Sequence, residues 1–135
     1  INYITDGDIA GALSVIGDKP RNDIYYSTGG APEGVVVAAA LSCYGGQIQG
    51  RLVLDDEEKI RAKKLGINDF NKKYNIQDMV KGDVIFCATG VTSGDLARGV
   101  VDLGNEYEVN TFVLHKSRSI IKSVTNIYNK WTHFL

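Results

Sequence analysis

The feature that most constrains this chain is a junction where an extended segment meets two glycines and continues directly into an apolar helical run. Ser27 and Thr28 are followed by Gly29-Gly30-Ala31-Pro32-Glu33-Gly34 and then by the apolar residues 35–41. The glycines permit positive φ and close approach of a ligand to the backbone, and proline suits the start of a helix. Free amides at such a helix end attract anions. The junction therefore predicts a buried helix whose first turn holds a phosphate or, through Glu33, a metal.

A second junction of the same kind lies upstream, where the strand-like residues 2–5 meet Asp6-Gly7-Asp8 and the helical run 9–16. Aspartate is a favoured helix cap and Asp-Gly a common turn, so we expect one of the two aspartates to cap the helix. The other is then free to accept hydrogen bonds from sugar hydroxyls or to join Glu33 near a hard divalent cation. For Glu33, the alternative is that it only complements the helix dipole. Together these groups predict a site for a polyhydroxylated, phosphorylated ligand with Mg²⁺ or Mn²⁺.

Strand-like and helix-like segments alternate along the first half of the chain. The expected pairs are strand 2–5 with helix 7–16, strand 23–28 with helix 32–44, and strand 47–54 with helix 56–65. This order is typical of an α/β fold with a parallel or mixed sheet. Further on we expect a short helix at 76–80 and strands at 83–88 and 108–115, whereas the period of residues 119–128 fits helix or strand. The chain is expected to form a single α/β domain, residues 1–135.

Composition excludes several classes of partner. The net charge is −1 and the isoelectric point about 6.1, which argues against binding to nucleic acid or an anionic membrane. No apolar run reaches the length of a membrane span. Cys43 and Cys87 are expected to be small buried hydrophobes in a reducing cytoplasm, and His115 is expected to have a structural or surface role. The apolar terminal residues, which include Trp131, are expected to pack on the core or on a neighbouring chain, as in a homo-oligomer.

Five collinear motifs carry a resemblance to a known family. They are DGDIAGAL at 6–13, GGAPEGVVVAAAL at 29–41, GQIQGRL at 46–52, FCATGVTSGDL at 86–96 and HKSRS at 115–119. In this order they resemble the carboxyl-terminal part of the class II fructose-1,6-bisphosphatases of bacteria, members of the lithium-sensitive phosphatase superfamily. The resemblance implies the carboxyl-terminal half of a three-layer α/β/α sugar-phosphatase fold. It also implies Mn²⁺- or Mg²⁺-dependent hydrolysis of the 1-phosphate of fructose-1,6-bisphosphate in gluconeogenesis, and in some relatives use of sedoheptulose-1,7-bisphosphate.

The resemblance also implies roles for particular residues. Asp6, Gly7, Asp8 and Gly30 match positions that contact the substrate, and Glu33 matches a metal ligand. The family's full chain is more than twice as long, and its amino-terminal half carries most of the metal carboxylates and the groups that position the attacking water. We therefore expect the catalytic residues in that missing half, which is the expected partner, and expect these 135 residues alone to be inactive.

Other functions remain open from the sequence. A non-catalytic sugar-phosphate or nucleotide-binding domain would use the same glycine turns without a metal, and a purely structural half-domain would bind nothing. The glycine spacing does not match the dinucleotide-binding fingerprint. Thr89, Thr92 and Asp95 follow a predicted strand and are candidates for the same cleft, although a turn that satisfies its own backbone explains them equally. Lys116 and Arg118 are candidate phosphate partners in a turn, where solvated cations are also common.

Overall fold

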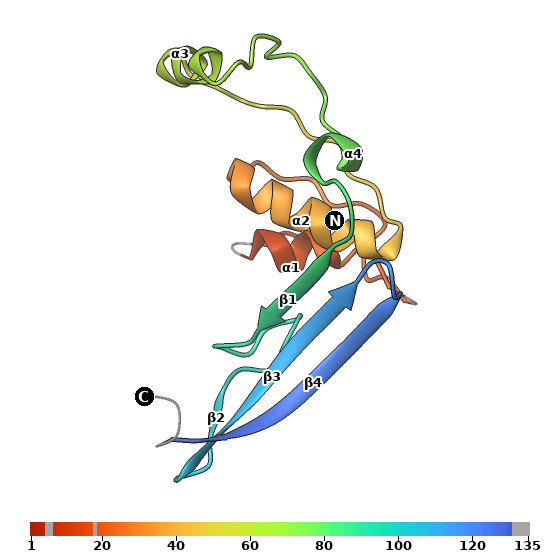
Figure 1. Ribbon diagram of the computed structural model, residues 1–135, viewed down its shortest axis with the longest axis vertical. Coiled ribbons are helices and arrows are strands. Elements are labelled where there is room, and N and C mark those ends of the chain that lie inside the picture. Colours follow the sequence, from red (N-terminus) through yellow and green to blue (C-terminus); the bar gives the residue numbers. More distant parts are fainter. Residues whose placement is uncertain (5–6, 18, 131–135) are drawn as a thin grey trace.

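The computed structural model describes residues 1–4, 7–17 and 19–130 and shows an α/β arrangement of helices at one end of an antiparallel sheet (Figure 1). The elements are, in chain order, α1 Asp8–Leu13, α2 Ala31–Tyr44, α3 Asp56–Lys64, α4 Ile76–Met79, β1 Ile85–Thr89, β2 Val101–Asp102, β3 Glu106–His115 and β4 Ile120–Asn129. Helices α1 and α2 pack on each other, and α2 also contacts β1 and β3. The hairpin of β3 and β4 extends away from these helices.

Strand β3 organises the sheet. On one edge it pairs with β1 along residues 111–115 and with β2 along residues 107–108, and on the other edge β4 pairs with its whole length. All of these pairings are antiparallel. Cross-strand partners lie on the same face of a sheet. Leu114 is the cross-strand partner of both Phe86 and Ile121, so these three side chains share one face of the sheet. This face is the one turned toward the helices, because Phe86 and Leu114 belong to the core.

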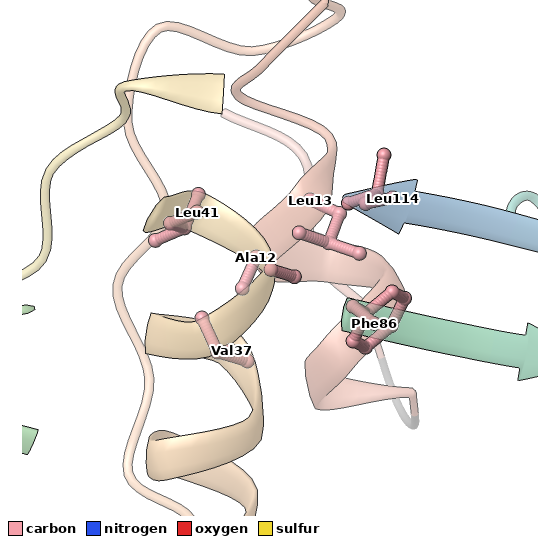
Figure 2. Packing of buried hydrophobic residues seen from close by; sticks show 7 residues of the cluster. Ala12, Leu13, Val37, Leu41, Phe86 and Leu114 are labelled. Atoms are coloured by element: carbon pink, nitrogen blue, oxygen red, sulfur yellow. The ribbon is translucent and has the colours of Figure 1, made fainter. Parts of the chain in front are cut away.

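The core lies where α1 and α2 meet the beginning of β1 and the end of β3 (Figure 2). Its buried side chains are Ala12, Leu13, Val37, Ala40, Leu41, Phe86 and Leu114. The small alanines of α2 let the helix approach its neighbours closely, and both Ala38 and Ala40 have no exposed surface. Leu114 is also fully buried, so β3 is the strand that joins the long hairpin to the helices.

The helices agree with the sequence because their end signals are local. Helix α2 begins after Gly30, contains proline in its first turn and ends at Gly45, whose left-handed conformation closes the last turn. Helix α3 has a complete capping box between Asp55 and Glu58. In Figure 1, α3 lies at the tip of an excursion that leaves the body near α4, and its charged side chains are largely exposed.

Three predicted strands and the parallel arrangement are not found among the described residues. Residues 2–4 and 23–28 are extended but form no ladder, and residues 47–54 contribute only one bridge, from Gly50 to Tyr74. A strand needs a neighbour along its length for its backbone hydrogen bonds. Within the described part of the chain, residues 2–4 and 23–28 pair with no strand, and residues 47–54 have only the two backbone bonds between Gly50 and Tyr74. The sheet that does form is antiparallel: β2, β3 and β4 follow one another through short turns, and β1 pairs with β3 across the longer connection of residues 90–105. Residues 120–128 belong to this sheet, as part of β4, and Ser119 lies in the turn before it.

Candidate functional site

The candidate site is built around Gly29 and Gly30, at the beginning of α2. Gly30 is the residue before the first helical turn, with an extended backbone at φ −68° and ψ 144°. The side chain of Glu33, in that first turn, folds back over Gly30. A Cβ atom at Gly30 would overlap Glu33 Oε2 and lie 3.0 Å from its Cδ. Glycine at this position therefore leaves the space that the Glu33 carboxylate occupies.

Asp8 approaches the same turn from α1. Its Oδ1 atom accepts hydrogen bonds from the Tyr25 hydroxyl at 2.8 Å and the Ser27 hydroxyl at 3.2 Å. Its Oδ2 atom lies beside Gly29, where a Cβ atom would come within 2.6 Å of it. The structure thus brings the Asp8 and Glu33 carboxylates to the backbone of two adjacent glycines, from two different helices.

Gly7 lies directly before α1 and sets the direction in which that helix begins. It precedes the helix in the left-handed region, at φ 85° and ψ 49°, where residues with a side chain are strained. Asp8 is the first residue of α1, and no side chain of the described residues caps that helix. Asp8 is therefore not the aspartate expected to cap it, and its carboxylate turns toward Tyr25 instead. Asp6 lies outside the described residues.

The surroundings of Tyr25 raise the pKa of a phenol that is already protonated at neutral pH. The pKa of Tyr25 is raised mainly because burial disfavours the charged phenolate, and the hydrogen bond to Asp8 and the negative charge there raise it further. A hydrogen bond from Ser27 acts in the opposite direction. A neutral phenol can donate its proton to Asp8 Oδ1 across the neutral pH range. Asp8 therefore has one occupied oxygen, held by two hydroxyls, and a second oxygen facing the glycine turn.

The described residues supply too few oxygens to enclose a divalent cation. Within them, no group of three or more histidine, cysteine, aspartate or glutamate side chains could hold a metal ion. Mg²⁺ and Mn²⁺ prefer about six oxygen ligands. Glu33, with Asp8 nearby, fits one or two of these positions, and the donor set is incomplete without further carboxylates.

Thr89, Thr92 and Asp95 line a separate hollow of about 290 Å³ between the loop after β1 and Ala10 of α1. Two of these three side chains, Thr89 and Asp95, have polar partners in the chain. The Thr89 hydroxyl lies 3.0 Å from that of Thr111, and Asp95 pairs with Arg21 at 3.0 Å. This loop therefore lies beside α1, and two of its polar side chains are bonded to other residues of the chain.

A second polar cluster ties the turn between β3 and β4 to the start of β1. Asp83 accepts hydrogen bonds from the Ser117 hydroxyl at 2.6 Å and the Ser117 amide at 3.0 Å, and contacts His115 Nε2 at 2.9 Å. These bonds, those from Ser117 above all, hold the pKa of Asp83 well below its usual range. His115 is therefore hydrogen-bonded within this cluster, which is consistent with the structural or surface role expected for it. Cys43 is half-buried, and the expectation of burial is wrong for Cys87, which is exposed on the sheet face opposite the helices.

Sequence reasoning missed Tyr25, Ser27 and the distinct role of Gly29. A signal was present in the alternation of residues 23–28, because positions 25 and 27 of an extended segment point to the same side. That side faces Asp8. Hydroxyl side chains are common in extended segments, so their residue type alone does not mark Tyr25 and Ser27 as partners of a carboxylate. Lys116, a candidate for phosphate, instead directs its ammonium group at the Gly82 carbonyl, 3.5 Å away.

No helix within the described residues is long and apolar enough to cross a membrane.

Comparison with known sequences identifies the family. Residues 1–128 match the profile of the family described as bacterial fructose-1,6-bisphosphatase, glpX-encoded.

Individual relatives agree with the family profile. The chain is 35% identical to a D-fructose 1,6-bisphosphatase class 2/sedoheptulose 1,7-bisphosphatase of Synechococcus sp. (strain JA-3-3Ab), over 96% of this chain. It is 33% identical to the fructose-1,6-bisphosphatase class 2 of Haemophilus influenzae, over 93% of this chain. The matched region spans 42% of the length of each of these relatives. The chain therefore belongs to the glpX-type family of bacterial class 2 fructose-1,6-bisphosphatases.

Proposed function

We propose that this chain supplies the sugar-orienting part of a metal-dependent fructose-1,6-bisphosphatase, which releases the 1-phosphate and leaves fructose-6-phosphate. The observation that carries the proposal is the convergence of Asp8 and Glu33 on the Gly29–Gly30 turn. A cation ligand and an acceptor for sugar hydroxyls have to lie near each other in such an enzyme. Family membership supports the reaction, and the geometry supports these roles.

In this proposal each group of the chain has a separate task. The Oδ2 of Asp8, which has no hydrogen-bond partner among the described residues, accepts hydrogen bonds from sugar hydroxyls, with Asp6 and Gly7 as further contacts, while the backbone of Gly30 contacts the substrate beside the first turn of α2. Glu33 provides one oxygen ligand to Mn²⁺ or Mg²⁺. When bound, such a cation activates water and neutralises the charge that develops on the phosphoryl oxygens. Orientation of the sugar against the reacting phosphate contributes several kcal/mol, up to about 7–11 in the best intramolecular cases.

We further propose that the extended segments complete a parallel or mixed sheet between two helix layers in the whole enzyme. Ile4 and Tyr25 both turn inward to Gly11 of α1. Tyr26, the neighbour of Tyr25, turns outward and is 90% exposed. Tyr3 and Ile24 are also largely exposed. Such alternation is the pattern of strands with one covered face. Polypeptide beyond the 42% of the relatives represented here is the proposed cover for the other face.

The cellular setting is part of the same proposal. Both cysteines are free thiols, which suits a reducing cytoplasm. A homo-oligomer also remains a prediction, because the apolar terminus on which it was based lies outside the described residues.

Ligand-dependent thermal stability tests the proposal against its alternatives. The complete gene product that contains this sequence is titrated with fructose-6-phosphate, with and without Mn²⁺. A phosphatase site predicts a rise in melting temperature that Mn²⁺ enhances. A non-catalytic sugar-phosphate domain predicts a rise that is indifferent to Mn²⁺, and a structural half-domain predicts none.

A matched pair of variants locates the metal effect. Glu33→Gln keeps the shape of the side chain and removes its charge, so the Mn²⁺-dependent part of the shift should disappear together with phosphate release. Glu57→Gln is the control, because Glu57 is an exposed residue of α3, far along the chain from the glycine turn. An enhancement by Mn²⁺ that survives Glu33→Gln would exclude Glu33 as a metal ligand.

A further inference from the structure

The side chain of Tyr25 joins the segment of residues 23–28 to one face of α1. Its ring lies against Gly11, where a Cβ atom would come within 2.7 Å of Tyr25 Cε2. Its hydroxyl reaches Asp8 Oδ1 at 2.8 Å. Asp8 and Gly11 are three residues apart and therefore share one face of α1. The absence of a side chain at Gly11 lets the ring lie along this face and end at the carboxylate.

Two hydroxyls fix the rotation of the Asp8 carboxylate. A carboxylate that accepts one hydrogen bond can turn about its Cβ–Cγ bond, whereas Oδ1 here accepts from Tyr25 and from Ser27. Both donors come from the same side of one extended segment. With Oδ1 held, Oδ2 is directed at Gly29 and the beginning of α2. A half turn would only exchange two equivalent oxygens, but the intermediate orientations that free rotation allows would turn the acceptor away from the glycine turn.

We propose that Tyr25 is a positioning residue, which with Ser27 holds Asp8 so that its free oxygen accepts a hydrogen bond from a sugar hydroxyl. This inference rests on the proposed function. It names a residue that acts through Asp8 and does not itself touch the substrate. The raised pKa of the Tyr25 phenol is consistent with this, because the residue stays a donor at neutral pH.

The test compares Tyr25→Phe with Tyr26→Phe in the complete gene product. Phenylalanine at position 25 retains the ring against Gly11 and loses only the hydroxyl. We expect the KM for fructose-1,6-bisphosphate and the Kd for fructose-6-phosphate to rise about tenfold, as for loss of a hydrogen bond to a charged group. The value of kcat should change less. Tyr26→Phe keeps the ring on the surface that we propose is covered and loses a hydroxyl with no hydrogen bond among the described residues, so it should change neither constant.

A double-mutant cycle separates positioning from a general structural effect. If Tyr25 acts through Asp8, Tyr25→Phe should weaken fructose-6-phosphate binding no further in a protein that already carries Asp8→Ala. Additive losses would show that Tyr25 acts independently of Asp8 and would overturn the proposal. Ser27→Ala should give a smaller loss than Tyr25→Phe, since its hydrogen bond is longer.

A titration keeps the inference testable apart from activity. The pKa of Tyr25, followed by NMR of labelled tyrosine rings, should fall in Asp8→Ala because the carboxylate contributes to its elevation. An unchanged value would overturn the contact itself. If the wild-type protein neither binds nor hydrolyses the sugar phosphates, the proposed function fails and this role with it. If the wild type is active and Tyr25→Phe matches Tyr26→Phe, only the positioning role fails.

Discussion

At the scale of single residues, the two glycines of the α2 junction serve two different carboxylates. Gly29 leaves room for Asp8 and Gly30 leaves room for Glu33. Neither residue needs glycine for its backbone, because both have ordinary negative φ. What they provide is space next to an acidic group. A substitution at either position is therefore a direct way to move one carboxylate without changing its charge.

Gly30→Ala should impair the metal-dependent function and leave stability nearly unchanged. The added Cβ atom meets the far end of a flexible side chain, so Glu33 moves aside at little cost. We expect a change in unfolding free energy of less than about 0.5 kcal/mol in urea denaturation. The enhancement of ligand-dependent thermal stability by Mn²⁺ should be lost. An unaltered Mn²⁺ effect would mean that Glu33 functions equally well in another rotamer.

Gly34→Ala is the matched control within the same motif. A Cβ atom at Gly34 would meet nothing within 4 Å, and the residue lies inside α2. Alanine in a helix is more favourable than glycine by about 0.5–1 kcal/mol. The variant should therefore unfold at a higher urea concentration and keep the Mn²⁺ effect. A loss of function here would point to a contact that this chain does not contain.

Asp83 should make stability depend on pH in the acid range. Its pKa is lowered in the folded protein, chiefly by the Ser117 hydroxyl and then by His115. The stabilisation is therefore present above its ordinary pKa of about 4 and is lost as the pH falls below it. Asp83→Asn should be less stable than wild type at pH 6, and the difference in urea midpoint should shrink toward pH 2. The variant Asp23→Asn, at an exposed carboxylate, should show no such trend.

At the scale of elements, the sequence predicted the helices well and the sheet only in part. Helix ends are set by nearby groups, such as Gly45 after α2 and the pair of Asp55 and Glu58 at α3. The residues 23–28 illustrate the limit, because their alternation predicts an extended segment but cannot supply a neighbouring strand. In the same way, the sequence of residues 119–128 fits a helix or a strand, and pairing with β3 determines that the segment forms a strand.

The candidate site was predictable to the same degree. The glycine turn, Asp8 and Glu33 can be recognised in the sequence because glycines before a helix indicate an anion site and carboxylates indicate binding of a metal or of hydroxyls. The convergence of Asp8 and Glu33 on Gly29 and Gly30 depends on how α1 packs on α2, which local patterns do not specify. The support of Asp8 by Tyr25 depends on the same packing.

Leu114→Ala should destabilise the contact between the hairpin and the helices strongly. Leu114 has no exposed surface and lies in the core cluster with Phe86 and residues of α1 and α2. Loss of a fully buried leucine costs about 2–5 kcal/mol because it leaves a cavity. Leu103→Ala, at a position that is 49% exposed, should cost much less. Urea denaturation of both variants measures the difference, and equal losses would contradict the assignment of the core.

At the scale of the whole molecule, the chain combines a small core with a large exposed apolar surface. Tyr3, Ile24 and Tyr26 are at least 82% exposed on the extended segments, and Ile85 is 66% exposed on the sheet. The matched region spans 42% of the length of the curated relatives. A large exposed apolar surface marks a contact with other polypeptide. The relatives' additional length is the polypeptide that we propose to cover it.

The 135 residues by themselves should release no phosphate from fructose-1,6-bisphosphate in the presence of Mn²⁺. Their described residues contain no cluster of three metal-binding side chains. Activity should appear when the remaining part of the gene product is added as a separate polypeptide. Ile24→Lys should prevent this recovery, because it puts a charge on the surface to be covered. Sustained turnover by the isolated chain would refute the division of labour.

The position of Leu114 in the core also governs when the site can become rigid during synthesis. The ribosome releases α1 and α2 long before β3, since domains emerge from the amino terminus. Until Leu114 arrives, the apolar sides of the helices that carry Asp8 and Glu33 lack part of their cover. The nascent chain is then a natural client for chaperones, and the two carboxylates reach their final alignment only after most of this sequence has been translated.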